Sequence, residues 1–290
     1  MIPNLNFYDV YGYLIPGLIL AVLIWLPYGL IANKWPSTDW ASALIAVVVG
    51  YVLGHIVQGL ARNALPSKTI NGRYPSDAFL DADDTTFSPT LKNRLRTHIL
   101  ELSGIDVRTD VNGSDVTPAI RAQRADGFRY CRDALLSSKT VSYAEQMQGM
   151  YTLTDGLVIA FLLAAAFTSG WVVAGQGMLR SVGLAVTAFG LIATLLVAVL
   201  GALDKATATT SARLMLAFFM LALVGAGYLL GIGRGSGLTQ RSWFAAMVLV
   251  YLAAAFGCYS TYKYFTKMYA QTVYRAFSLY EKSTQDSESE

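Results

Sequence analysis

Two groups of charged residues in the polar middle of the chain could bind a ligand, judged by their types and spacing. The first group consists of the carboxylates Asp77, Asp81, Asp83 and Asp84. Such a cluster favours a cation or forms an acidic contact surface for a partner, although a solvated acidic loop has the same pattern. It lacks the regular spacing and the bidentate glutamate of an EF-hand loop.

The second group is basic and lies on a predicted helix, where Arg121, Arg124 and Arg132 fall near one face. Guanidinium groups in such a stripe bind nucleotide phosphates or anionic lipid headgroups. We therefore predict that the acidic and basic groups supply ligand-binding residues. The alternative is that the arginines of this region form surface ion pairs with nearby carboxylates. These carboxylates are Asp106, Asp110, Asp126 and Asp133.

Catalysis is the function class that the sequence favours least. Arg94 and His98 stand four residues apart on a predicted helix, one residue closer than the usual minimum in ribonuclease-type Arg…His motifs. The chain has no GxSxG motif, no phosphate loop, no CxxC pair and no metal-ligand spacing. We therefore expect a non-enzymatic protein with no catalytic residues, no metal and no cofactor.

The elements that must position these residues follow from a strongly apolar composition. Of the 290 residues 54% are hydrophobic and only 14% are charged, whereas a soluble domain carries about 25% charged residues. A bilayer core about 30 Å thick needs roughly 20 apolar helical residues. We predict an all-α membrane protein with about six transmembrane helices and a small, mostly helical cytoplasmic module between the second and third. The six stretches are 13–32, 41–61, 156–175, 181–203, 214–232 and 243–262.

Positive charge sets the predicted orientation. An even number of spans places both termini on one side, and that side carries 18 of the 22 Lys and Arg residues. The positive-inside rule therefore places both termini and the large loop in the cytoplasm. Cys131 in the loop and Cys258 in the last span agree, because they form no disulfide framework.

The chain divides by composition into four predicted parts. A two-helix transmembrane hairpin covers 1–64, the cytoplasmic module 65–154, a four-helix transmembrane region 155–262, and a helical extension with an acidic tail 263–290. We expect the extension to continue the sixth span. It should pack either on the module or along the lipid headgroups.

Within the module, the local sequence predicts helices and a short β element. The pair Ser88-Pro89 starts a helix with apolar residues at 3.6-like spacing, which Gly104 ends. Residues 105–115 favour a short strand or hairpin. A longer helical pattern begins at Pro118, breaks at Gly127 and continues into the third span. That continuation would couple the module mechanically to the membrane.

His55 and Gln58 are the notable polar groups inside the predicted spans. Polar side chains at that depth normally face a bundle interior or a watery path. They stand three apart on one helix face, so one interpretation is that they line a pore or gate. The alternative is interhelical hydrogen bonding. Small-residue pairs that favour close helix contacts, within or between subunits, are Gly50-x-x-x-Gly54 and Gly227-x-x-x-Gly231.

Two short motifs carry a resemblance to a known group. The first is Tyr8-Asp9-x-x-Gly12-x-x-x-Pro16-Gly17, which leads into the first span, and the second is Gly54-His55-x-x-Gln58 in the second span. With the layout above, they resemble membrane effector subunits of bacterial antiphage defence systems linked to nucleotidyltransferases, of the Hailong type or CBASS-like.

The resemblance implies a homo-oligomeric ion channel of the bacterial inner membrane. Its cytoplasmic module would sense an oligonucleotide or cyclic nucleotide made by a partner nucleotidyltransferase during antiviral defence. The alternative function is a non-catalytic membrane scaffold. Such a scaffold would recruit a cytoplasmic partner protein through the acidic surface of residues 77–84.

Overall fold

The described part of the chain is mainly helical. The computed structural model describes residues 9–65, 70, 73–137, 142–173, 186–187, 189–193, 208–231 and 238–279. These residues form an all-helical fold, as predicted, and their β pairing is limited to an isolated bridge between Ile70 and Arg73. The chain divides into two compact units. We call them the membrane unit (Met1–Pro66 and Gly149–Tyr262) and the polar module (Ser67–Gln148 and Lys263–Glu290).

Four helices of the described chain are long and apolar enough to cross a membrane. They are Val10–Ala32, Trp40–Ala64, Tyr143–Val173 and Ser242–Ser278, and they match the predicted first, second, third and sixth spans. The predicted fifth span corresponds to a shorter apolar helix, Leu214–Leu230. Most of the predicted fourth span, 181–203, lies outside the described residues. The six-span topology therefore stays a prediction.

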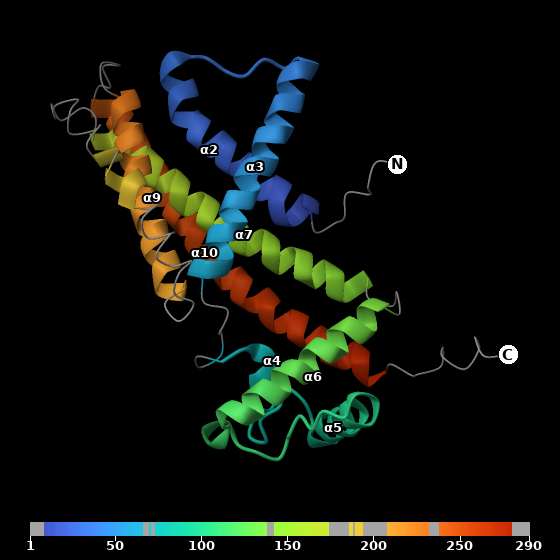
Figure 1. Ribbon diagram of the computed structural model, residues 1–290. Helices are drawn as coiled ribbons and strands as arrows, with labels where there is room; N and C mark the ends of the chain where they lie inside the picture. The colour runs from blue at the N-terminus through green and yellow to red at the C-terminus, as the bar shows by residue number, and fades with distance from the viewer. Residues whose placement is uncertain are drawn as a thin grey trace. The chain divides into compact units, whose positions relative to one another are not determined.

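The membrane unit consists of helices, which Figure 1 shows as ribbons. Their bounds are Val10–Leu14 (the π-helix η1), Ile15–Ala32 (α2), Trp40–Ala64 (α3), Ser142–Val173 (α7), Ala208–Gly231 (α9) and Leu238–Ser278 (α10). Five of them contribute buried side chains to one hydrophobic core. Examples are Leu20 of α2, Val57 of α3, Ile159 of α7, Leu216 of α9 and Tyr251 of α10.

Glycine lets α2 and α3 approach until their backbones touch. A Cβ atom at Gly17 would overlap the carbonyl oxygen of Gly50, and one at Gly54 would overlap the carbonyl oxygen of Tyr13. The predicted close contact of Gly50 and Gly54 is therefore confirmed, and it is made within one chain. The two resemblance motifs, which are far apart in sequence, meet at this contact.

A second glycine contact joins α7 to α9. A Cβ atom at Gly170 would overlap the carbonyl oxygen of Val224, and one at Gly227 would overlap the carbonyl oxygen of Phe167. Gly227 of the other predicted pair thus also serves packing inside the chain.

The polar module has its own hydrophobic core. Its described helices are α4 (Pro75–Ala78), α5 (Pro89–Ser103), the 3-10 helix η2 (Gly113–Asp115) and α6 (Pro118–Ser137), together with the first residues of α7 and the last of α10. The predicted start of α5 is confirmed, because the Ser88 side chain accepts a hydrogen bond from the Leu91 amide at 3.2 Å. Gly104 ends the helix with φ at 73°.

Two local predictions in the module are wrong. Residues 105–115 form no strand, because the carbonyl groups of Val107 and Arg108 accept hydrogen bonds from the Arg124 side chain rather than from a neighbouring strand. The predicted break at Gly127 is absent, since α6 runs through it. A side chain there would overlap the Val107 side chain, so Gly127 provides space for packing.

The end of α10 belongs to the core of the polar module. Val273, Tyr274 and Phe277 are buried there with side chains of α5 and α6 such as Leu95 and Cys131. The Tyr274 hydroxyl donates a hydrogen bond to the Ser76 carbonyl at 2.7 Å. The extension therefore packs on the module, which confirms one of the two alternatives for this segment.

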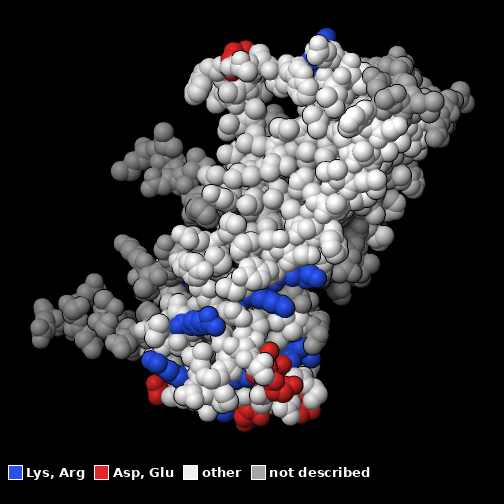
Figure 2. Space-filling model, turned by 180° about the vertical axis from the view of Figure 1, so that it is seen from behind, with Lys and Arg blue, Asp and Glu red and all other residues white. Residues whose placement is uncertain are grey.

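Charge is distributed very unevenly over the surface. On the face of the molecule that Figure 2 shows, Lys, Arg, Asp and Glu gather in one part. Most of the remaining described surface on this face carries no charge. Exposed apolar side chains on α3 and α10 include Ile45, Val48, Leu249 and Phe256. A wide uncharged apolar surface is what helices in contact with lipid present.

Candidate functional site

A polar cleft of about 510 Å³ in the polar module brings together four of the seven predicted ligand-binding residues. These are Asp81, Asp83, Asp84 and Arg121. The other residues that line the cleft are Ile70, Arg73, Ala78, Gly113 and Ser114. The loops beside α4 and η2 thus place the acidic residues opposite the start of α6.

A buried network of two arginines and two aspartates lies beside the cleft. Two of its members, Arg73 and Asp81, also line the cleft. Arg73 binds Asp77 at 2.8 Å and Asp81 at 2.6 Å. Arg124 binds the same carboxylates at 3.2 Å and 2.6 Å. The four side chains are between 0% and 11% exposed, so each charge is compensated inside the protein.

All three nitrogens of the Arg124 guanidinium group donate hydrogen bonds to oxygen atoms of the protein. Besides the two carboxylates, its nitrogens donate to the backbone carbonyl groups of Asp77, Leu80, Val107 and Arg108. Asp77, Asp81 and Arg124 therefore hold the loops of the module together. Among the predicted ligand-binding residues of the cleft, the exposed side chains are Asp83 and Arg121, and Asp84 is half-buried.

The sequence analysis did not predict the contacts of two residues that hold the loops of the cleft. Arg73 stands four residues before Asp77, which is the spacing of an ion pair on a helix, but Arg73 precedes α4 and is not helical. Lys92 is 4% exposed and donates to the carbonyl groups of Asp81 and Asp84. The charge pattern places Lys92 in the basic group but does not predict these contacts, because the acceptors are backbone atoms.

Two carboxyls of the acidic segment, Asp77 in the buried network and Asp83 in the cleft, are held in the ionised state. Burial favours the neutral form of Asp77, but hydrogen bonds and charge from Arg73 and Arg124 outweigh it, and the pKa of Asp77 lies below its usual value of 3.8. A hydrogen bond from the Gly113 amide, 2.9 Å away, is the main cause that lowers the pKa of Asp83. Both side chains are therefore anionic at neutral pH.

These lowered pKa values predict acid sensitivity of the module. A carboxyl whose pKa is lower in the folded than in the unfolded chain stabilises the fold above the unfolded pKa, and this stabilisation is lost as the pH falls through the folded value. We expect the stability of the module to be constant from pH 7 to about 5 and to decrease below about 4. Hydrogen exchange of α6 amides in the full chain, corrected for intrinsic rates, measures this. The decrease should be smaller in Asp77→Asn, and an equal decrease would contradict the assignment.

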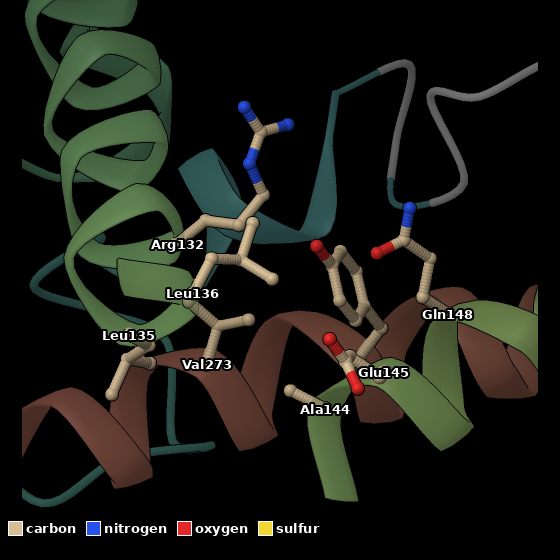
Figure 3. A pocket seen from close by; sticks show the side chains of 8 residues that line it. Arg132, Leu135, Leu136, Ala144, Glu145, Gln148 and Val273 are labelled. Carbon is tan, nitrogen blue, oxygen red and sulfur yellow. The ribbon is translucent and has the colours of Figure 1, made fainter. Parts of the chain in front are cut away.

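Arg132 lies apart from the cleft. It borders a narrow crease that is also lined by Leu135, Glu145 and Val273 and is too narrow to admit water. Figure 3 shows its guanidinium group extending away from the apolar side chains of the crease. It pairs with Asp133 at 2.8 Å.

Several arginines of the region form surface ion pairs, which was the alternative interpretation of the basic group. Arg96 binds Asp106 at 2.7 Å and Asp110 at 3.4 Å. Arg129 binds Asp126 at 3.0 Å. Together with the Arg132–Asp133 pair, these contacts confirm that interpretation for three arginines of the region. By contrast, Arg121 forms no ion pair with any described residue.

The described part of the chain contains no group of three or more His, Cys, Asp or Glu side chains arranged to hold a metal ion. The possible catalytic pair Arg94 and His98 lies on α5, where the His98 ring packs edge-on against Phe277 with centroids 5.3 Å apart.

His55 and Gln58, predicted to line a pore or gate, lie in different environments. Gln58 is 1% exposed, and its amide nitrogen donates to the Thr152 carbonyl at 2.6 Å and to the Asp155 carboxylate at 3.1 Å. This is the interhelical hydrogen bonding of the alternative interpretation. His55 is exposed, and its ring stacks on Tyr13 with centroids 4.2 Å apart.

The Gln58 contact is expected to stabilise the packing of α3 on α7. Gln58→Ala removes the donor for a buried carbonyl and a buried carboxylate, so we expect a loss of about 1–2 kcal/mol of unfolding free energy. Titration of the detergent-solubilised protein with a denaturing detergent measures this loss. Val52→Ala, on the same helix and exposed, is the control and should change the unfolding free energy by less than about 0.5 kcal/mol. The effect of Gln58→Ala should shrink in an Asp155→Ala background; additive effects would exclude the proposed coupling.

Comparisons of the chain with protein-family models, with curated proteins and with solved structures found no match.

Proposed function

We propose that this chain is a non-catalytic subunit of an oligomeric ion-conducting pore whose polar module binds a nucleotide or oligonucleotide and thereby gates the pore. The observation that carries the proposal is that α7 and α10 are single helices that each contribute residues to both units. Ligand binding that alters the packing of Val273 or Tyr274 in the module acts on the same helix that packs Tyr251 in the membrane unit.

The polar cleft is the proposed ligand site. Exposed Arg121 offers a guanidinium group to a phosphate, and exposed Asp83 offers a carboxylate to base amino groups or ribose hydroxyls. The buried network beside it fixes the loops that carry these groups. A ligand shifts the open–closed equilibrium only if it binds the two states with different affinity.

The proposed ion path lies between copies of the chain. The exposed face of α3 carries Tyr51, His55 and Gly59 at steps of four residues. Exposed polar groups inside an apolar helix are costly against lipid. A second copy that covers this face would remove that cost and place His55 along the path, while buried Gln58 would hold the lining helix in position.

The proposed cellular location and partner are based on the charge distribution and on the resemblance. We propose a multi-pass protein of a bacterial inner membrane with both termini in the cytoplasm. Its proposed partner is a nucleotidyltransferase, whose oligonucleotide or cyclic nucleotide product would be the ligand in antiviral defence. Eighteen of the 22 basic residues on the proposed cytoplasmic side support this orientation.

The test combines particle size with ion flux. Purified full-length protein is sized in detergent and then reconstituted in liposomes, and ion flux is recorded with and without oligonucleotides and cyclic nucleotides. The proposal predicts a closed oligomer whose flux responds to one of these ligands, and loss of that response in Arg121→Glu. A monomer that passes no ions under every ligand would overturn it.

A scaffold that recruits a basic partner protein is the second candidate. It is favoured by the exposed carboxylate of Asp83, which is the accessible part of the acidic segment, whereas Asp77 and Asp81 are buried in ion pairs. Recovery of a partner protein that is abolished by Asp83→Lys, with ion flux unchanged, would favour the scaffold over the pore.

A further inference from the structure

An apolar groove lies between α2 and α10 in the membrane unit. Its volume is about 280 Å³, and its lining residues are Leu30 and Ile31 of α2 with Trp243, Phe244 and Met247 of α10. Among these five side chains the Trp243 indole N–H is the only polar group. Sites for small organic ligands begin at about 300 Å³, so the groove has the size for a single hydrocarbon chain.

The floor of the groove is packed, whereas its walls are exposed. Phe244 is 2% exposed and belongs to a hydrophobic cluster with Phe167 and Trp171 of α7. The rings of Trp171 and Phe244 have centroids 6.0 Å apart. On the walls, Leu30 is 54% and Trp243 68% exposed. The groove is therefore a fixed depression on the outside of the helices that no described side chain fills.

Tryptophans indicate the depth of the groove in the membrane. Of the five tryptophans in the chain, four are exposed. They lie in the second half of α2, in the loop after it, at the start of α3 and near the start of α10, namely Trp25, Trp35, Trp40 and Trp243. The groove itself brings the start of α10 to the end of α2. Because tryptophan is enriched at the membrane–water interface, the groove lies at the headgroup end of the hydrocarbon core.

Contacts within this end of the unit hold two of the tryptophans in place. The Trp25 indole donates a hydrogen bond to the Lys34 carbonyl at 3.1 Å. The Trp35 ring lies against Gly29, where an added Cβ atom would come within 3.1 Å of it. The loop after α2 thus folds back on the helix that carries Leu30 and Ile31, and the end of α2 keeps its position beside α10.

The chemistry of the groove favours an acyl chain as its occupant. A void beside Phe244 would lose dispersion contacts. Water needs two to four polar partners in a cavity, which this lining does not offer. Within a bilayer the surrounding molecules are acyl chains, and their association with helices depends on close packing. At this depth an indole offers an apolar ring to the acyl chain and an N–H donor to the ester oxygens.

We infer that the groove between the end of α2 and the start of α10 binds one acyl chain of a phospholipid. The site is separate from the polar cleft, and it does not depend on the proposed gating. It requires only that α2 and α10 cross the bilayer.

The experiment titrates detergent-solubilised full-length protein with phosphatidylcholine and counts bound lipid by native mass spectrometry. The original protein should retain one tightly bound lipid per copy. Leu30→Ala/Trp243→Ala removes both exposed walls of the groove and should weaken this binding about tenfold. Leu30→Met/Trp243→Phe keeps large apolar side chains at both positions and should bind as the original protein does.

Val22→Ala/Leu249→Ala is the matched control, because these residues of α2 and α10 are 62% and 68% exposed and do not line the groove. It should leave lipid binding unchanged. An equal loss in this control, or unchanged binding in Leu30→Ala/Trp243→Ala, would overturn the inference. So would an original protein that binds no lipid and whose oligomer dissociates in Leu30→Ala/Trp243→Ala, since a second copy would then occupy the groove. Circular dichroism of every variant verifies that the helices are intact.

Discussion

Replacing Arg124 with alanine is expected to lower the unfolding free energy of the polar module by about 3–5 kcal/mol. Arg124 is 0% exposed and compensates Asp77 and Asp81, which Arg73 alone would otherwise have to pair. Its loss leaves uncompensated buried charge and also removes the donors for the carbonyl groups of Leu80 and Arg108. A loss of this size is comparable to the whole stability of a small domain.

Arg121→Ala is the matched control, because Arg121 lies one turn earlier on α6, is exposed and forms no ion pair with the described residues. Its effect should stay within about 0.5 kcal/mol. Hydrogen exchange of the α5 and α6 amides in the full chain measures both variants. Similar protection in Arg124→Ala and Arg121→Ala would show that the buried network does not hold the module together.

Replacing Gly54 with alanine is the second substitution with a large expected effect. The added methyl group would overlap the backbone carbonyl of Tyr13, which cannot rotate away as a side chain could. We expect a loss of about 2–4 kcal/mol and separation of α3 from the start of the first span. Because both resemblance motifs meet at this contact, the variant should also lose any ion flux.

The control is Gly257→Ala, in α10 at a position where an added Cβ meets nothing within 4 Å. It should leave stability unchanged or raise it by up to about 1 kcal/mol, because alanine has the higher helix propensity. Unfolding is followed by tryptophan fluorescence during titration with a denaturing detergent, since Trp25 lies in α2 and Trp40 in α3. Equal stability of Gly54→Ala and Gly257→Ala would contradict the glycine contact.

The sequence was sufficient to predict the helices that are specified by local signals. The start of α5 at Ser88-Pro89 and its end at Gly104 follow from capping chemistry that acts within a few residues. Four of the apolar stretches coincide with helices long enough to cross a membrane, because length and composition alone define such helices.

Contacts between distant segments could not be predicted from local patterns. The strand expected in 105–115 is absent because Arg124, on another element, takes the carbonyl groups that a strand partner would need. Gly127 has the same local sequence whether it breaks a helix or provides space for Val107. His55 and Gln58 are three residues apart, yet only packing against α7 decides that Gln58 is buried and His55 exposed.

Only part of the candidate ligand site could be predicted, because contacts between distant segments decide which of its charged residues are buried. Charge pattern identified the cleft residues Asp81, Asp83, Asp84 and Arg121. It could not separate the accessible residues Asp83, Asp84 and Arg121 from Asp77, Asp81 and Arg124, whose charges are compensated inside the module. That distinction depends on burial, which a list of charged residues does not contain.

Control of the membrane helices by the polar module is tested most directly by interrupting α10. Insertion of three glycines between Tyr262 and Lys263 leaves the residues of both units unchanged but interrupts α10, one of the two helices that contribute residues to both units. Liposome flux is then recorded with and without the nucleotide ligand, and ligand binding is measured in parallel. The account predicts that the ligand still binds and that the flux no longer responds to it. A flux that responds as in the original chain would contradict control through α10.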